Sequence, residues 1–266
     1  MLGTGAQIIS QVRLGAVDLT TIGDSYLGNL ARVAGISAVP FAFGSLKDAV
    51  ATLDGPLRKF QRDAIAQLGL FAFNKSWPTG IRQTINGIRP INVMDDFKGL
   101  KLRTADDPVA VGLFKALGAS PVPTAPSEIY SSLQTHVVDG VELPLSAMES
   151  YKVYEVQKYI SYTNHAFTAL GLYMNLETWQ KLPQSLQNTV DRNFDIAAEL
   201  YRQDTLRQDA SFEATLKRQG MTFNKPDITL AAYRAAVRAA GLYRQLRDVY
   251  GADAWNLLEK SVGKLT

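Results

Sequence analysis

Cysteine is absent from this 266-residue chain, which excludes disulfides, thiolate catalysis and cysteine-based metal sites. Histidine is nearly absent, with only His136 and His165 present. Their separation matches neither the i, i+4 spacing of a helical metal pair nor a histidine-rich tract. We therefore interpret both as hydrogen-bonded structural side chains, and we expect no metal and no other cofactor.

Long apolar runs and a strong charge bias are also missing. No window reaches the roughly 18 apolar residues that span a bilayer. The formal net charge is only +3, and basic and acidic residues alternate along most of the chain, so nucleic acid is not an expected partner. The first residues, MLGTGAQIIS, lack the basic and apolar regions of a secretory signal, which taken literally indicates the cytoplasm.

Short catalytic motifs are absent as well: there is no G-x-S-x-G, phosphate-binding loop, H-E-x-x-H or dinucleotide fingerprint. An enzyme built on this chain would have to use Asp, Glu, Lys or Tyr. Asp106, Asp107 and Glu142 have no spacing that marks an acid and base pair. We therefore predict that the chain is not an enzyme, and we keep an enzyme of organic-acid metabolism as the alternative.

What the sequence does contain is an alternation of helical and extended patterns, which predicts an α/β fold long enough for two cores. Helices are expected over residues 7–14, 46–53, 57–68, 109–117, 127–133, 149–159 and about 186–216, and extended segments over 16–23, 70–73, 82–90, 100–104, 137–143 and 166–174. Residues 75–80 read as a loop because Pro78 and Gly80 punctuate them.

The helix expected over residues 186–216 is longer than the usual 8 to 20 residues. It should pack across both lobes or dimerise. A structural dimer built on this helix is a third interpretation of the chain, and it predicts a flat apolar seam.

Two arginines, Arg82 and Arg103, lie at the edges of extended segments. The run LKLRT alternates apolar and polar residues as a half-buried strand does, so Arg103 comes at a strand's carboxyl end. Ligands of open α/β sheets bind outside those strand ends, and a guanidinium matches a carboxylate. Ser25 and Tyr26, at the end of the first strand, are pocket candidates by the same rule. From these residues alone, solvated ion pairing of the arginines remains open.

Longer segments resemble a known family, the DctP family of TRAP-transporter solute-binding proteins. They are PINVMDDFKGLKLRT, LFKALGASPVPTAPSEIYSSLQTHVVDGVELPL and YEVQKYISYTNHAF. QVRLGAVDL, the G-x-R of Gly80 to Arg82, and WQKLPQSLQ agree in the same order. The resemblance covers nearly the whole chain.

The resemblance implies a periplasmic binding protein with two α/β lobes, a hinge and a long helix crossing both, which delivers its ligand to a membrane permease. It implies that Arg103 pairs with the ligand carboxylate and that Arg82 lies close by. Asp139 to Pro144 would form another wall, and Asp106 is a further candidate contact. The first lobe is expected to comprise residues 1–80 and about 169–208, and the second about 81–168 and 209–266.

Two departures from the family pattern refine these expectations. Leu143 stands where many members have Asn, and Pro126 stands at a position that is often aromatic. An apolar wall there predicts a monocarboxylate with an apolar or aromatic portion, less hydroxylated than a sugar acid. Members also begin with a signal peptide and a strand-helix-strand module, which we expect this chain to lack through truncation or a mis-assigned start.

Overall fold

The computed structural model describes residues 5–28 and 30–266. The α-helices in this part of the chain are α1 (Gly5–Arg13), α2 (Asp24–Leu27), α3 (Leu46–Leu53), α4 (Pro56–Ala66), α5 (Pro108–Ala116), α6 (Ile129–Gln134), α7 (Leu145–Ser150), α8 (Leu176–Lys181), α9 (Gln184–Arg218), α10 (Leu230–Ala239), α11 (Leu242–Tyr250) and α12 (Ala252–Val262). Short 3-10 helices are η1 (Arg32–Ala38), η2 (Met94–Phe97), η3 (Pro126–Glu128) and η4 (Val153–Glu155).

The described strands form one mixed sheet. They are β1 (Leu19–Gly23), β2 (Leu70–Ala72), β3 (Trp77–Asn86), β4 (Lys101–Thr104), β5 (Ser120–Pro123), β6 (Gly140–Leu143), β7 (Tyr159–Asn175) and β8 (Thr222–Asn224). Their order is β1-β7-β3-β6-β4-β5, and β2 and β8 also pair with β7. β4 runs parallel to β5 and β6, whereas β3 is antiparallel to β6 and β7. The parallel part therefore gathers the carboxyl ends of β4, β5 and β6 at one edge.

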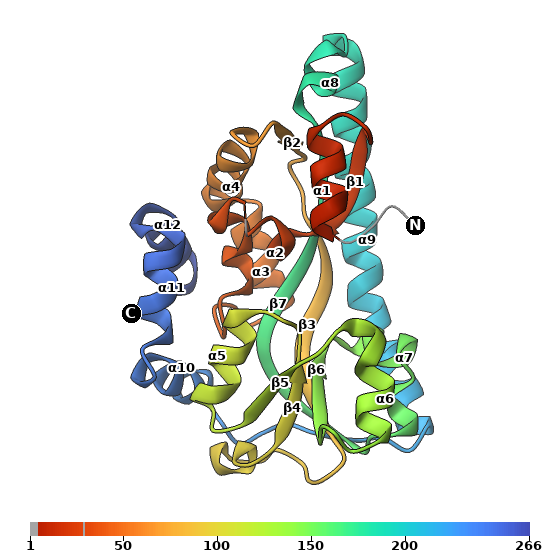
Figure 1. Ribbon diagram of the computed structural model, residues 1–266, viewed down its shortest axis with the longest axis vertical. Helices are drawn as coiled ribbons and strands as arrows, with labels where there is room; N and C mark the ends of the chain where they lie inside the picture. Colours follow the sequence, from red (N-terminus) through yellow and green to blue (C-terminus); the bar gives the residue numbers. More distant parts are fainter. Residues whose placement is uncertain (1–4, 29) are drawn as a thin grey trace.

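Two lobes are joined by β3, β7 and α9, which run along the long axis of the molecule (Figure 1). In the upper lobe of that view, β1 and β2 pair with the carboxyl-terminal half of β7. In the lower lobe, β6 pairs with the carboxyl-terminal end of β3, β4 pairs with β6, and β5 pairs with β4. The predicted two-lobed α/β fold with a long helix spanning both lobes is confirmed, while the residue boundaries of the lobes stay a prediction.

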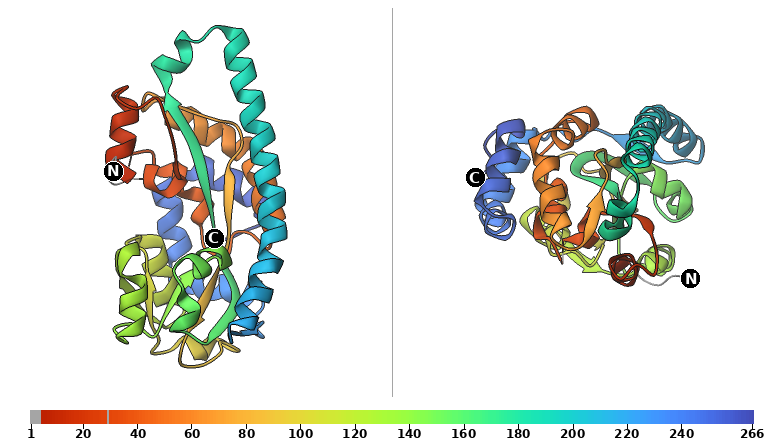
Figure 2. Two further views of the ribbon diagram at one scale, coloured as in Figure 1. Left: turned by 90° about the vertical axis from the view of Figure 1, so that its right-hand side faces the viewer. Right: turned by 90° about the horizontal axis from the view of Figure 1, so that it is seen from above.

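Helix α9 is 35 residues long, which corresponds to about 52 Å at 1.5 Å per residue, and Figure 2 shows it running beside both lobes. Arg202 ties it to the upper lobe through both Asp54 oxygens, at 2.7 and 2.8 Å, and through the Ser76 carbonyl. Leu216 joins the apolar core of the lower lobe. The middle and the carboxyl-terminal end of α9 are therefore fixed to different lobes.

Two local predictions were wrong. The helix expected over residues 149–159 is replaced by the end of α7, by η4 and by the start of β7. Tyr159 and Ile160 pair with β3 and β8 instead, because their aromatic and β-branched side chains suit a pleated, half-buried surface. The prediction of a loop over residues 75–80 was also wrong, since Trp77 to Gly80 already lie in β3. Register shifts interrupt the pairing of this part of β3 with β7.

The carboxyl-terminal helices α10, α11 and α12 form a layer on one side of the molecule (Figures 1 and 2). Their buried side chains Tyr233, Tyr243 and Trp255 join the largest apolar cluster, which also contains residues of α3 and α5. Among the described helices, none is both long and apolar enough to cross a bilayer.

Candidate functional site

Arg103 lies at the carboxyl end of β4, as the sequence predicts, and only 2% of its surface is exposed. Its guanidinium donates from Nε to Thr124 Oγ1 at 3.2 Å and from Nη2 to the Thr124 carbonyl oxygen at 2.5 Å. Burial lowers the pKa of Arg103 below its usual value. The nearby Glu142 carboxylate and the hydroxyls of Tyr151 and Tyr26 offset only part of this shift. Tyr26 belongs to α2 of the upper lobe, so a side chain of that lobe lies within electrostatic range of Arg103.

Arg103 differs from the other buried arginines in its lack of an acidic partner. Arg58 pairs with Asp24 at 3.4 Å, and Arg202 pairs with Asp54 at 2.7 Å. Among the described residues, no carboxylate lies within ion-pair distance of Arg103, and its guanidinium donates instead to neutral atoms of Thr124. A buried guanidinium without an anion is costly, and a carboxylate from outside the chain would complete this arrangement.

Arg82, in contrast, is already engaged inside the protein. Its Nη2 donates to Glu142 Oε1 at 2.8 Å and to the Glu142 carbonyl oxygen at 2.8 Å, while Nε contacts Oε2 of the same carboxylate. Gly80, two residues earlier, has φ of +117°, a conformation that favours glycine. The register of β3 against β7 shifts just before Gly80 and again just after Arg82, so irregular pairing flanks the Gly80-Ile81-Arg82 segment.

Glu142 is held from two sides in the buried interior. His165 Nε2 lies 3.2 Å from Glu142 Oε2, and His165 Nδ1 lies 2.9 Å from Thr163 Oγ1. Burial alone would raise the pKa of Glu142, but Arg82 and His165 outweigh it and lower the pKa to about 2. Burial lowers the pKa of His165, and the hydrogen bond to Glu142 opposes part of this shift. His165 is thus a hydrogen-bonded interior side chain, as the sequence predicts.

The remaining predicted residues occupy different environments. Leu143 ends β6 with 4% of its surface exposed and packs in the lower-lobe core. Pro126 begins η3 and is exposed, as are Asp106 and Tyr26. Ser25 lies in α2, but its side chain is outside the part that the structure describes.

Sequence reasoning missed several neighbours of the arginines. Burial raises the pKa of Asp107, and this carboxyl lies close enough to Glu142 and Arg82 for both to affect that pKa as well. Its Oδ1 accepts from the Val109 amide at 2.9 Å and caps α5. An Asp directly before a proline at a helix start is a capping signal, and it could have identified Asp107. No local signal points to Thr124 or Tyr151.

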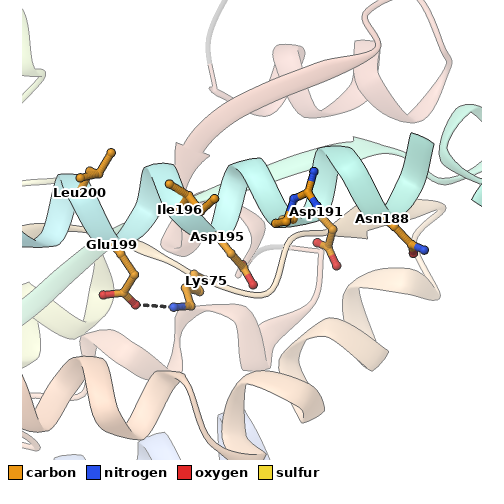
Figure 3. Close-up of a pocket in the computed structure, with 8 residues that line it drawn as sticks. Lys75, Asn188, Asp191, Asp195, Ile196, Glu199 and Leu200 are labelled. Atoms are coloured by element: carbon orange, nitrogen blue, oxygen red, sulfur yellow. Dashed lines mark hydrogen bonds and ion pairs between the residues drawn. The ribbon is translucent and has the colours of Figure 1, made fainter. Parts of the chain in front are cut away.

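A surface groove that the structure describes lies away from both arginines. It has a volume of about 540 Å³ and is lined by Lys75 and by residues of α9 between Asn188 and Leu200 (Figure 3). Lys75 forms an ion pair with Glu199 inside it. It is an open surface feature without Arg82 or Arg103. The described residues also contain no group of three or more histidine, aspartate or glutamate side chains that could hold a metal ion.

The sequence of this chain matches a known protein family. Residues 1–245 match the family model DctP, described as bacterial extracellular solute-binding protein, family 7. A solute-binding protein of Roseobacter denitrificans is 36% identical over 244 residues, which cover 91% of this chain and 73% of the relative.

Solved structures agree with the sequence match. A TRAP periplasmic solute-binding protein from Ochrobactrum anthropi superimposes with a TM-score of 0.91 at 28% identity, covering 98% of this chain and 81% of that one. A TRAP periplasmic solute-binding protein from Chromohalobacter salexigens, with bound D-glucuronate, gives a TM-score of 0.90 at 25% identity, covering 100% and 86%.

Proposed function

Because the chain belongs to family 7 of the bacterial extracellular solute-binding proteins, we propose that Arg103 anchors the carboxylate of its solute between the two lobes. The observation that carries this proposal is the burial of Arg103 without an acidic partner among the described residues. Arg58 and Arg202 show that the fold normally supplies a carboxylate to a buried arginine. A solute would supply the one that Arg103 lacks.

Family membership confirms the resemblance seen in the sequence and the prediction that the chain is a binding protein. The family and the matching structures are solute-binding proteins of transporters, not enzymes, so the alternative of an organic-acid enzyme is set aside. The family is periplasmic and works with TRAP membrane permeases.

Arg82 acts differently from Arg103 in this proposal. Its charge is matched by Glu142, with two contacts to the carboxylate and one to the Glu142 carbonyl oxygen. A charge-assisted hydrogen bond contributes about 1.5 to 3 kcal/mol, and Arg82 already makes such bonds within the chain. Arg82 therefore fixes the electrostatic surroundings of the site, and Arg103 holds the solute.

The body of the solute is proposed to carry an apolar or aromatic portion. Arg103 lies level with Val141 of β6, and alternate residues of a strand point to the same face. Leu143, two residues after Val141, therefore shares the face of Arg103 and places an apolar side chain beyond it. Pro126 adds a second non-polar surface near Thr124, the residue that holds Arg103.

The proposed mechanism is closure of the lobes around the solute. Tyr26 of the upper lobe affects the pKa of Arg103 in the lower lobe, so a solute on Arg103 can contact both. Such a solute shifts the open and closed populations by its differential affinity for them, and the closed receptor then docks on a TRAP permease. Asp106, Tyr26 and Ser25 remain proposed solute contacts.

Isothermal titration of the full chain with two probes tests the proposal. Phenylacetate represents a monocarboxylate with an aromatic body, and D-glucuronate represents a sugar acid. The proposal expects phenylacetate to bind more tightly, with affinity that falls sharply in the Arg103→Met variant. Tighter binding of D-glucuronate would contradict the apolar body, and equal affinity of wild type and variant would remove Arg103 from the site.

A further inference from the structure

Four side chains spaced four residues apart form a row along α9. Arg192, Ile196, Leu200 and Asp204, here called the α9 ridge, are all exposed. The exposed fractions are 52% for Ile196 and 56% for Leu200. Figure 3 shows these two apolar side chains directed away from the Lys75 to Glu199 ion pair on the adjoining face. Two large apolar side chains therefore face outward between two opposite charges.

We propose that the α9 ridge pairs with the α9 ridge of a second copy of this chain, in antiparallel orientation. In a two-fold interface, if residue i contacts residue j, then j also contacts i. With the axis at the level of Ala198, Ile196 of each copy lies level with Leu200 of the other. Rows of residues spaced by four interdigitate when two helices pack, so the apolar pairs would be buried at the centre.

The charges at the two ends of the ridge are complementary under the same symmetry. Arg192 of one copy lies level with Asp204 of the other, and this happens twice. Within the described part of the chain, Arg192 forms no ion pair, and Asp204 binds Arg207 at 2.6 Å through Oδ1 alone. The second Asp204 oxygen can accept from Arg192. Two such pairs would fix the register and orientation.

Self-complementarity is the reason to assign a second copy rather than a different protein. Reversing the ridge end to end places aspartate opposite arginine and leucine opposite isoleucine, so the reversed row is complementary to the original. A foreign partner requires no such symmetry. Arg192, Ile196 and Leu200 of the ridge also line the surface groove beside Lys75, and no ridge residue is proposed to touch the solute. The pairing is therefore independent of the proposed function.

Sedimentation velocity of the full chain over a concentration series tests the pairing through reversal of the charges. We expect wild type to dimerise with a dissociation constant in the micromolar range, equivalent to about 8 kcal/mol. Arg192→Asp and Asp204→Arg should each be monomeric alone, because like charges then face each other. An equimolar mixture of these two variants should form a heterodimer, since both of its charged pairs are again opposite in sign.

A matched control separates the ridge from exposed apolar surface in general. Val249 on α11 is 42% exposed and lies outside α9, so Val249→Asp should leave dimerisation unchanged, whereas Leu200→Asp should abolish it. Wild type that stays monomeric throughout, or single charge variants that dimerise as wild type does, would overturn the inference. Failure of the mixture to associate would overturn the proposed register.

Discussion

Arg82 and Glu142, 60 positions apart in sequence, form an ion pair in which the guanidinium contacts both oxygens of the carboxylate. The pair lies in the lower lobe, with 3% of the Glu142 side chain and 18% of the Arg82 side chain exposed. This contact distinguishes Arg82 from Arg103, two arginines whose sequence surroundings are similar. Arg82 is neutralised within the chain, whereas Arg103, which has no such partner among the described residues, is the arginine that we propose to pair with a solute.

Glu142→Gln should destabilise the fold strongly, because it leaves the Arg82 guanidinium in the interior without its counter-ion. Breaking one side of a buried ion pair costs about 3 to 5 kcal/mol, and urea unfolding of the variant measures the loss. Glu177→Gln provides the matched control, since its ion pair with Lys181 is 75% and 72% exposed. The control should change the unfolding free energy by at most about 1 kcal/mol. Equal losses in both variants would contradict the buried role of Glu142.

The contribution of Glu142 should disappear in acid. Its pKa is lowered from 4.5 to about 2 in the folded chain, so the carboxylate stabilises the fold above the unfolded-state pKa and stops doing so as the pH falls through about 2. The unfolding free-energy difference between wild type and Glu142→Gln should therefore shrink between about pH 5 and pH 2. A difference that stays constant over this range would show that Glu142 titrates normally.

Arg202→Met should loosen α9 from the upper lobe. The substitution removes two contacts to Asp54, two to the Ser76 carbonyl oxygen and one to Glu199 within α9. Because the Asp54 side chain is 34% exposed, water compensates part of the loss, and we expect destabilisation of about 2 kcal/mol. Arg207→Met, in which a 70% exposed side chain is replaced, should be nearly neutral in the same thermal unfolding measurement. A neutral Arg202→Met would place the anchoring of α9 elsewhere.

Leu143→Asn should move solute preference toward hydroxylated acids. An amide at this position can hydrogen-bond a solute hydroxyl, whereas leucine cannot. We expect the ratio of D-glucuronate affinity to phenylacetate affinity to rise by about tenfold, or 1.4 kcal/mol. Leu145→Asn, in the same core cluster and 5% exposed, should cost stability without changing the ratio. An unchanged ratio in Leu143→Asn would exclude Leu143 from contact with the solute.

Local sequence patterns were sufficient where neighbouring residues decide the structure. The alternation in LKLRT placed Arg103 at the end of β4, and the helices expected over residues 46–53 and 57–68 correspond to α3 and α4. The helix expected over residues 186–216 is α9, extended by a few residues at each end.

Long-range pairing explains what the sequence could not reveal. The amino-terminal part of β7 is a strand because β3 and β8 pair with it, and residues 149–159 carry no local trace of those partners. Likewise, the bond from Arg82 to Glu142 joins β3 to β6. The sequence identified both arginines as candidates, but it could not tell which one already has an anion.

Titration of the Arg103→Met variant tests the central claim most directly. The probe is whichever of phenylacetate and D-glucuronate binds wild type more tightly. A second variant, Arg103→Lys, keeps the positive charge but loses the planar guanidinium. Loss of the charge-assisted contact should weaken binding in Arg103→Met by about 100-fold, or 2.7 kcal/mol, with Arg103→Lys intermediate and both variants folded. Binding of the probe to folded Arg103→Met with wild-type affinity would contradict the assignment of Arg103 as the carboxylate anchor.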